Sequence, residues 1–260
     1  MQKIFLLASF VFFILLATAQ NSIPFSEIIK ARKKSSIPII GSDSALKNRL
    51  KHRGTGFFVN YSNNCVVLIT AEHVVVIKDS LTNKTIRPLQ NIYANVNLSN
   101  DSTVLVPLDL IYRDEALDFA ILQLKQPVGF DIKKGIINLE AINFSQLDEA
   151  ADLKEGELLL YIGYPISRQG FVSQNVIESN KFLMDGFVQG GYSGSPVYRI
   201  KTNPQNSTWT FKVVGIIQAY PNDYTQTINS KEKIVINPGF TIVGKLKEVI
   251  KIMADANCTD

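Results

Sequence analysis

The sequence predicts an all-β protein that ends in a single amphipathic helix. From residue 54 onward, short apolar runs alternate with turn residues, and runs of this length and spacing are typical of a β-barrel or a β-sandwich. With 46% hydrophobic and 19% charged residues, the chain of 260 residues has the composition of a globular protein that can bury a sizeable core. The clearest apolar runs lie at 57–59, 65–70, 92–98, 103–110, 119–124, 158–162, 170–177, 211–219 and 234–236.

Residues 1–19 have the layout of a secretory signal peptide. Lys3 precedes an apolar run that ends at Leu16, and the small residues Ala17 and Ala19 follow it. The run is shorter than the about 20 residues that a membrane-spanning helix needs, and the sequence has no second run of this kind. We therefore expect cleavage near Ala19 and a soluble mature protein without a membrane span, either secreted or periplasmic.

Residues 20–53 are predicted to form an N-terminal arm or pro-segment, because polar and basic residues mix there with short apolar patches that show no sustained period. The formal net charge of +4 is spread over short clusters, which is too mild to indicate a nucleic-acid partner. The two cysteines, Cys65 and Cys258, could form one disulfide in an exported protein. Because Cys258 lies near the end, where chains fray, the sequence leaves this bridge open.

The rest of the sequence divides into two halves and a closing helix. Residues 129–157 hold few strand-like runs and several acidic side chains, which is typical of a connection between two barrels, here 54–128 and 158–243. In 244–257, four apolar residues follow the i, i+3, i+4, i+7 spacing of an amphipathic helix. These residues are Leu246, Val249, Ile250 and Met253.

Three short segments each carry one member of a nucleophile, base and orienter set. His73 follows Thr-Ala-Glu, Asp118 lies between leucine and phenylalanine, and Ser193 lies within Gly-Gly-Tyr-Ser-Gly-Ser-Pro. A hydroxyl is a poor nucleophile until an imidazole takes its proton, and a carboxylate fixes the tautomer of that imidazole. The sequence therefore predicts a serine of the last segment, Ser193 or Ser195, as nucleophile, His73 as general base and Asp118 as orienter.

Neighbouring residues are less suited to these roles. The only other histidine, His52, belongs to the basic arm. Asp118 lies between apolar residues, where an ionised carboxylate is costly unless a partner such as imidazole compensates, whereas Asp114 and Glu115 precede the apolar strand and are predicted to lie in a solvated turn. Two histidines and two distant cysteines give no zinc spacing, and no histidine follows Ser193 as an α/β-hydrolase would require.

Five segments follow one another in an order found in a known family. They are Gly-x-Gly-Phe at 54–57, Thr-Ala-x-His at 70–73, Asp-x-Ala-Ile-Leu at 118–122, Ile-Gly-x-Pro at 162–165, and the serine segment at 190–197 with Val-x-Gly-Ile at 213–216 behind it. In these segments the chain resembles the trypsin-like serine peptidases of the chymotrypsin fold, nearest the bacterial HtrA and glutamyl-endopeptidase branch but without a PDZ domain. The resemblance implies two six-stranded β-barrels, and cleavage of a protein or peptide substrate through an acyl-enzyme without metal or organic cofactor.

The resemblance also decides between two serines of one segment. In the family, the two backbone N–H groups that bind the developing oxyanion belong to the nucleophile and to the glycine two residues before it. Gly191 stands two residues before Ser193, whereas no glycine stands two residues before Ser195. This implies that Ser193 is the nucleophile and that the N–H groups of Gly191 and Ser193 form the oxyanion hole.

For the substrate pocket, the resemblance implies a base at Phe187, six residues before the nucleophile, and a wall along the strand that follows Ile216. None of these positions is charged, so we expect cleavage after small or medium apolar residues such as alanine, valine or leucine. Asp223 remains an alternative, because it could reach the pocket and attract a basic side chain. The expected wall residues are Ile217, Gln218, Ala219 and Tyr220.

Ile39 begins a segment similar to the N-terminus that is freed when animal digestive proteases are activated, but Tyr192 replaces the aspartate that would receive this amine. The activation switch is therefore not expected, and Ile39 is expected to be ordinary arm sequence. Tyr192 also supports a second hypothesis, a catalytically silent secreted binding or regulatory protein on the same fold. The sequence gives no indication of the oligomeric state.

Overall fold

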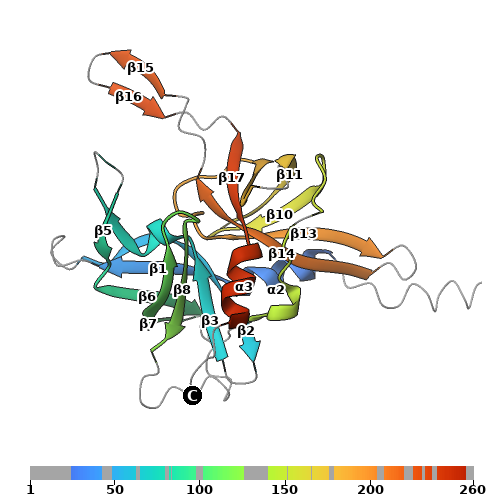
Figure 1. Cartoon of the computed structure of the whole chain (residues 1–260), viewed down its shortest axis with the longest axis horizontal. Coiled ribbons are helices and arrows are strands. Elements are labelled where there is room, and N and C mark those ends of the chain that lie inside the picture. Colours follow the sequence, from blue (N-terminus) through green and yellow to red (C-terminus); the bar gives the residue numbers. More distant parts are fainter. Residues whose placement is uncertain are drawn as a thin grey trace, which may run out of the picture.

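Two six-stranded antiparallel β-barrels make up the fold, as the computed structural model of the chain shows (Figure 1). The all-β, two-barrel fold expected from the sequence is confirmed, and so is the C-terminal helix, α3 (Lys247–Asp255). The structure describes residues 25–42, 49–62, 65–79, 82, 84–97, 102–125, 140–150, 152–164, 166–175, 179–203, 208–219, 225–229, 232–235 and 239–255.

The first barrel has the strand order β1-β6-β7-β8-β3-β2, and antiparallel pairing of β1 with β2 closes it. A short strand, β9 (Ile142–Asn143), adds to β2 in parallel, and β4 (Val76–Lys78) forms a separate hairpin with β5 (Thr85–Pro88). The barrel strands are β1 (Ser36–Ser42), β2 (Lys51–Ser62), β3 (Cys65–Thr70), β6 (Asn91–Asn97), β7 (Thr103–Asp114) and β8 (Phe119–Leu124).

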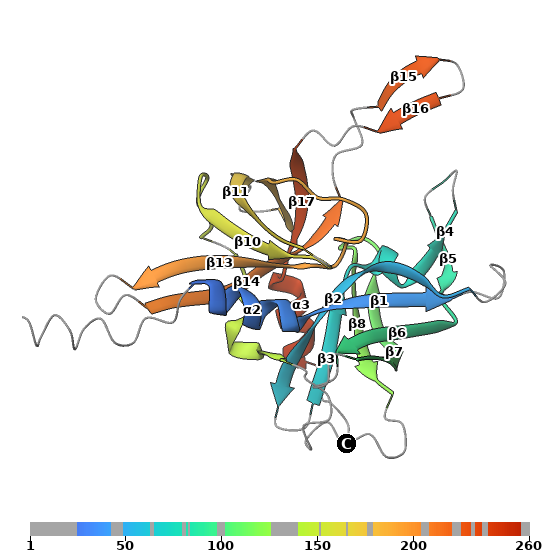
Figure 2. The same ribbon diagram turned by 180° about the vertical axis from the view of Figure 1, so that it is seen from behind.

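The second barrel is closed in the order β10-β11-β12-β17-β14-β13. Figure 2 shows that the hairpin of β15 (Thr225–Asn229) and β16 (Glu232–Val235) stands away from both barrels. The barrel strands are β10 (Leu158–Ile162), β11 (Ser167–Asn175), β12 (Lys181–Asp185), β13 (Pro196–Asn203), β14 (Thr208–Ala219) and β17 (Phe240–Lys245).

Three apolar clusters form the core, one in each barrel and one between them. Ile39 and Leu68 are wholly buried in the first barrel, and Leu159 and Met184 are wholly buried in the second. Burial of each such side chain contributes about 1.5–3 kcal/mol to the stability of the fold. The third cluster therefore stabilises the contact between the two barrels. It combines both barrels with the apolar face of α3: Phe57, Ile69, Phe119, Leu160, Val213, Leu246, Val249 and Met253.

Arg199 of β13 holds the acidic connection between the barrels. Its side chain is only 4% exposed, its Nη1 lies 2.6 Å from Asp152 Oδ1, and its Nη2 lies 3.0 Å from Glu157 Oε2. Burial alone would lower the pKa of Arg199, but the side-chain hydrogen bonds with Glu157 and Asp152 outweigh burial and raise it. The acidic residues of the connection therefore anchor it to the second barrel.

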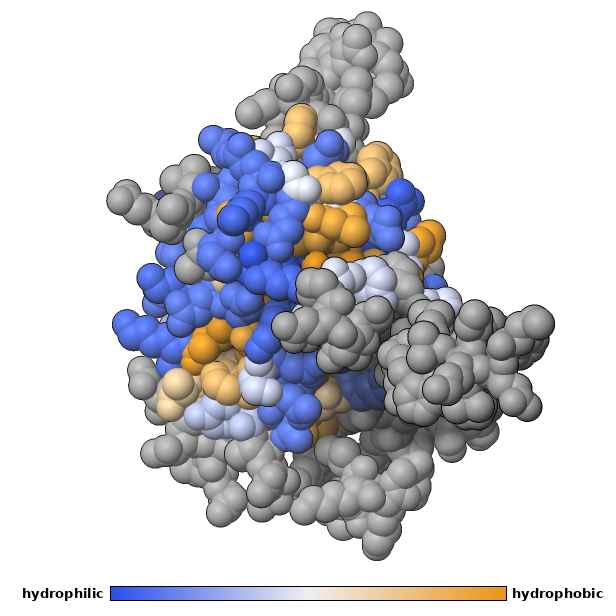
Figure 3. All heavy atoms as spheres, turned by 90° about the vertical axis from the view of Figure 1, so that its right-hand side faces the viewer, coloured by the Kyte–Doolittle hydropathy of each residue, from blue (hydrophilic) through white to orange (hydrophobic). Residues whose placement is uncertain are grey.

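The face on the right-hand side of Figure 1 is mostly hydrophilic. Figure 3 shows that the apolar side chains of this face lie in separate patches between hydrophilic residues. Scattered apolar side chains of this kind are normal on a soluble protein surface and need no partner to cover them.

Some sequence predictions fall outside the described residues. These include the signal peptide predicted for 1–19 and Cys258. Cys65, at the start of β3, is disulfide-bonded. Among the helices that the structure describes, none is long and apolar enough to cross a membrane.

The first barrel begins earlier than the sequence predicted. Strand β1 and the preceding helix α2 (Phe25–Ser35) lie within 20–53, the range assigned to an arm or pro-segment. In β1, Ile39 pairs with Gly54 of β2 and with Ala94 of β6, so this segment is part of the barrel wall. The prediction is wrong there because β1 is short, contains Pro38, and owes its place to partner strands later in the chain, which leave no local pattern.

Replacing Ile39 by alanine should destabilise the whole first barrel. Because Ile39 is wholly buried, the Ile39→Ala variant should lose about 2–5 kcal/mol of unfolding free energy, measured by urea denaturation followed by circular dichroism. Ile86→Ala is the matched control, since Ile86 is 59% exposed and its removal should cost less than about 0.5 kcal/mol. Equal losses in both variants would show that β1 does not belong to the barrel.

Candidate active site

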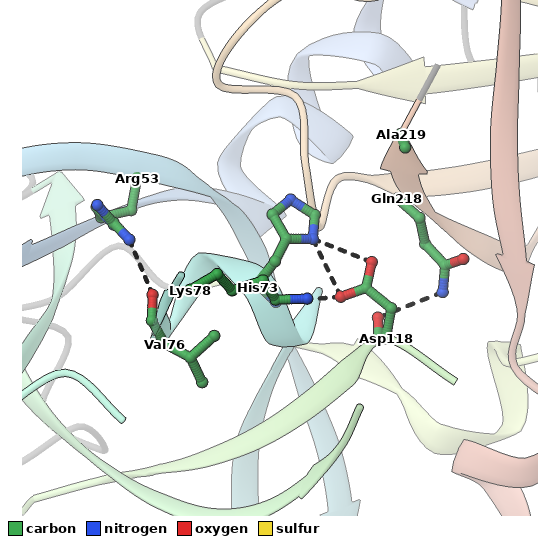
Figure 4. Close-up of a pocket in the computed structure, with 7 residues that line it drawn as sticks. All are labelled: Arg53, His73, Val76, Lys78, Asp118, Gln218 and Ala219. Carbon is green, nitrogen blue, oxygen red and sulfur yellow. Dashed lines mark hydrogen bonds and ion pairs between the residues drawn. The ribbon is translucent and has the colours of Figure 1, made fainter. Parts of the chain in front are cut away.

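His73 and Asp118 meet at the edge of the first barrel. His73 lies in the 3-10 helix η2 (Glu72–Val74) after β3, and Asp118 lies in the turn that joins β7 to β8. The imidazole Nδ1 is 3.0 Å from both carboxylate oxygens, and Oδ1 also accepts the backbone N–H of His73 at 3.1 Å (Figure 4). Because an ionised carboxylate only accepts, Nδ1 carries the proton, and Nε2 is an acceptor without a partner among the described residues.

The turn that carries Asp118 is held from the second barrel. Asp118 has a φ of 50°, in the left-handed region, which aspartate tolerates better than most residues. Gln218 of β14, only 3% exposed, donates its Nε2 hydrogens to Leu117 O at 2.5 Å and to Asp118 O at 3.3 Å. A strained backbone conformation persists only where neighbouring groups stabilise it, and here the hydrogen bonds from Gln218 do so.

A buried carboxylate fixes the position of η2. Glu72, which precedes His73, is wholly buried, and its Oε1 accepts Arg113 Nη1 at 2.9 Å and Thr85 Oγ1 at 3.1 Å. Lys78 Nζ lies 3.4 Å from Oε2. A buried charge is tolerated only when it is paired and hydrogen-bonded, as Glu72 is. Since Arg113 lies in β7, the ion pair ties His73 to the strand that leads to the Asp118 turn.

Of the two serines in the loop before β13, only Ser193 reaches a cavity. Ser193 is partly exposed and lines a pocket, whereas Ser195 is wholly buried and its hydroxyl has no hydrogen-bond partner among the described residues. The carbonyl of Ser193 accepts the N–H of Thr55 at 2.8 Å. No hydrogen bond joins Ser193 Oγ to the His73 imidazole in the described part of the chain, and in substrate-free sites such bonds are often long.

Two amides of the serine loop remain available. The N–H groups of Tyr192, Gly194 and Ser195 donate to backbone carbonyls, at 3.2, 2.7 and 2.9 Å. By contrast, the N–H groups of Gly191 and Ser193 donate to no described residue. Gly194 has a φ of +82°, and a Cβ there would lie 2.1 Å from the carbonyl oxygen of Thr55, so only glycine fits. The loop therefore contains two backbone donors, those of Gly191 and Ser193, that have no partner among the described residues.

The pocket beside Ser193 has a volume of about 210 Å³ and an uncharged lining. It includes Ile217, Gln218 and Ala219, which were predicted to form the wall. Tyr220 lies outside the described residues. The described lining consists of Val188, Gln189, Gly190, Tyr192, Ser193, Ile217, Gln218 and Ala219.

Phe187, predicted to form the base of this pocket, does not line it. Its side chain is 47% exposed, and the guanidinium of Arg168 lies 5.2 Å from its ring centroid. Its carbonyl accepts the hydroxyl of Tyr161 at 2.8 Å, which fixes the backbone while the ring points to solvent, and Val188 and Gln189 take its place. Burial raises the pKa of Tyr161 to about 12, so this phenol remains a donor at neutral pH.

A second cavity, of about 460 Å³, adjoins His73. Gln218 and Ala219 line both cavities, so the end of strand β14 forms a wall that the two cavities share. In the second cavity Arg53 and Lys78 lie on the side of His73 that faces away from the carboxylate (Figure 4). No pattern in the sequence predicted either cation at this position.

Tyr192 anchors the serine loop through an aromatic side chain. It is wholly buried, and its hydroxyl donates to Ile166 O at 3.1 Å. Its ring lies so close to Gly163 that a Cβ there would be 2.3 Å from the ring carbon Cδ1, and it meets the Tyr161 ring edge-on at 6.1 Å. The Tyr192 side chain thus holds the loop by packing and by one hydrogen bond. Ile39, buried in β1, is not a free N-terminus in this structure.

Two barrels of this kind, with a carboxylate-held imidazole on one and a partly exposed serine on a glycine-rich loop of the other, define the class of the chymotrypsin-like serine peptidases. Comparison with protein families matches residues 54–203 to the trypsin-like peptidase domain, and the chain belongs to this family. A search of curated proteins found no match. Among the described residues, no group of three or more histidine, cysteine or acidic side chains could hold a metal ion.

The packing of Tyr192 against Gly163 should control the serine loop. In Gly163→Ala the added methyl group would overlap the Tyr192 ring, so we expect at least a tenfold slower reaction of the serine with a fluorophosphonate, because overpacking displaces the loop. Tyr192→Phe loses only the bond to Ile166 and should cost about 1 kcal/mol of stability. Tyr164→Phe, at a tyrosine that is 48% exposed, is the control for both measurements. Wild-type labelling in Gly163→Ala would show that the contact does not position the loop.

Proposed function

We propose that this protein is an exported serine endopeptidase that cleaves peptide bonds through an acyl-enzyme, with Ser193 as nucleophile, His73 as general base and Asp118 as orienter. The observation that carries the proposal is the imidazole whose Nδ1 is fixed by a carboxylate while Nε2 stays free, in a cavity that shares its wall with the serine pocket. This is the arrangement in which an imidazole can accept a hydroxyl proton.

In the proposed reaction, Ser193 Oγ attacks the carbonyl carbon of the peptide bond while His73 Nε2 takes its proton. The negative charge that forms on the carbonyl oxygen accepts hydrogen bonds from the N–H groups of Gly191 and Ser193. The carbon–nitrogen bond then breaks as His73 returns the proton to the leaving amine. A water molecule then attacks the carbonyl carbon of the acyl-enzyme while His73 takes its proton. The bond to Ser193 Oγ breaks, and His73 returns the proton to the serine. Asp118 keeps Nδ1 protonated throughout.

Export is supported by two features. The first is the signal-peptide layout of residues 1–19, and the second is the disulfide-bonded state of Cys65, because disulfides persist in oxidising compartments. Within the family we propose the bacterial HtrA and glutamyl-endopeptidase branch, since Tyr192 anchors the serine loop without an activated N-terminus.

A second candidate is a catalytically silent secreted binding or regulatory protein on the same fold. It is favoured by the missing hydrogen bond between Ser193 Oγ and His73 in the described part of the chain. A fluorophosphonate separates the two functions, because it reacts with a serine only when base and oxyanion hole are assembled. Labelling of Ser193 supports the enzyme, and an unlabelled, folded protein supports the silent alternative.

Substitution of the two serines tests the nucleophile. We expect Ser193→Ala to lose turnover of a casein substrate by a factor on the order of a million, as in other serine proteases that lose this residue, with unchanged folding. Ser195→Ala should retain most activity, because this hydroxyl is wholly buried and has no hydrogen-bond partner among the described residues. EDTA should not affect the rate, because no step uses a metal. An inactive Ser195→Ala with an active Ser193→Ala would reverse the assignment.

The uncharged pocket beside Ser193 should accept small or medium apolar side chains. Val188, Ile217 and Ala219 give it an apolar lining, and no charged side chain is among its described lining residues. Cleavage sites in a mixed peptide library should therefore show alanine, valine or leucine before the cut bond. Predominant cleavage after lysine, arginine or glutamate would contradict this, and the first two would point to Asp223, which lies outside the described residues.

A further inference from the structure

The cavity beside His73 contains positive charge that the proposed reaction does not use. Arg53 of β2 and Lys78 of β4 line this cavity together with the imidazole. Figure 4 shows both cations on the side of His73 that faces away from Asp118. The charge therefore lies next to the general base, and outside the uncharged pocket beside Ser193.

Most hydrogen-bond donors of the Arg53 guanidinium have no partner among the described residues. Its Nη2 donates to the carbonyl of Val76 at 2.9 Å, and in the described part of the chain Arg53 forms no ion pair with a carboxylate. A guanidinium has five N–H donors in a planar fork, and one carbonyl leaves its charge uncompensated. Such a group binds a carboxylate through two parallel hydrogen bonds.

Lys78 adds charge to the same cavity. Its Nζ lies 3.4 Å from Glu72, but this carboxylate also binds Arg113 at 2.9 Å. Glu115 also interacts electrostatically with Lys78 and Arg113, so these two cations share two carboxylates, and Arg53 is the cation of the cavity without a carboxylate partner among the described residues. Asp118, the carboxylate among the described lining residues, is occupied by the imidazole of His73. The described lining is thus positive on the side of Arg53 and Lys78.

The direction of a bound substrate follows from the two cavities. In the proposed reaction, the pocket beside Ser193 receives the side chain before the scissile bond, so we infer that the chain before this bond runs along the wall residues Gln218 and Ala219. His73 must protonate the leaving amine, so the chain after the bond passes the imidazole. Beyond the imidazole, on the side away from Asp118, lies Arg53.

We propose that the Arg53 side of this cavity, away from Gln218 and Ala219, binds an acidic side chain of the substrate, at one of the first two residues after the scissile bond. The inference rests on the proposed function, and it adds a specificity element on the leaving-group side. Arg53 is the main carboxylate ligand and Lys78 supports it. Preferred cleavage sites then combine an apolar residue before the bond with aspartate or glutamate after it.

Two quenched fluorescent peptides test the proposal. Both have leucine before the scissile bond, and they carry either glutamate or glutamine at the first two positions after it. We expect the wild-type protein to cleave the glutamate peptide with about tenfold higher kcat/KM, and this ratio should fall as NaCl rises from 50 to 500 mM, because salt screens partly exposed charges. A ratio of one, or faster cleavage of the glutamine peptide, overturns the proposal.

Variants identify the residues involved. Arg53→Gln should bring the glutamate-to-glutamine ratio close to one, Arg53→Lys should keep most of it because the charge remains, and Lys78→Gln should lower it partly. Lys181→Gln, which removes an exposed cation from β12 in the second barrel, is the matched control and should leave the ratio unchanged. An unchanged ratio in Arg53→Gln, or an equal loss in Lys181→Gln, overturns the role of Arg53.

A binding measurement separates this inference from the proposed function. The Ser193→Ala protein is titrated with dye-labelled versions of the two peptides, and fluorescence anisotropy reports their Kd values without turnover. Tighter binding of the glutamate peptide that is lost in Ser193→Ala/Arg53→Gln supports the acidic subsite even if the wild-type protein cleaves nothing. Equal Kd values for the two peptides overturn the subsite even if the wild-type protein is an active peptidase.

Discussion

Thr55 of β2 holds the serine loop of the second barrel at two points. Its N–H donates to Ser193 O at 2.8 Å, and its hydroxyl donates to Gly191 O at 2.7 Å while accepting the N–H of Tyr164 at 3.2 Å. Thr55 is wholly buried, so water cannot replace these bonds, and losing one would leave a polar group unsatisfied at a cost of about 1–3 kcal/mol. The orientation of the two free loop amides therefore depends on a strand of the other barrel.

The first barrel also depends on the second for the position of one site residue. Gln218, on β14 of the second barrel, holds the turn that carries Asp118 on the first. Each barrel thus positions groups that the other presents, and neither barrel alone contains a complete site. The apolar cluster between the barrels, capped by α3, supplies the free energy that keeps them together, because apolar burial is large and non-directional. The few hydrogen bonds across the junction supply the geometry.

Much of this arrangement could be predicted from the sequence, because the segments around His73, Asp118 and Ser193 combine local composition with a fixed order. The amphipathic period of α3 was equally visible. What the sequence did not indicate depends on contacts between distant residues. Strand β1 owes its position to β2 and β6, and Phe187 turns outward because Tyr161 holds its carbonyl. Spacing along the chain carries no information on either contact.

Tyr192 shows how a substitution that departs from the family pattern can be compensated locally. A carboxylate at this wholly buried position would need a cation, since an unpaired buried charge is unstable. A phenol needs only one acceptor, Ile166 O, and a flat surface, which Gly163 provides by having no side chain. This anchor uses the Tyr192 side chain, Ile166 O and Gly163, and no chain end. The buried position of Ile39 in β1 agrees with this, because a chain end freed at Ile39 would have to leave the barrel wall. The serine loop is therefore held by the packing of Tyr192 within the second barrel and by Thr55 of the first.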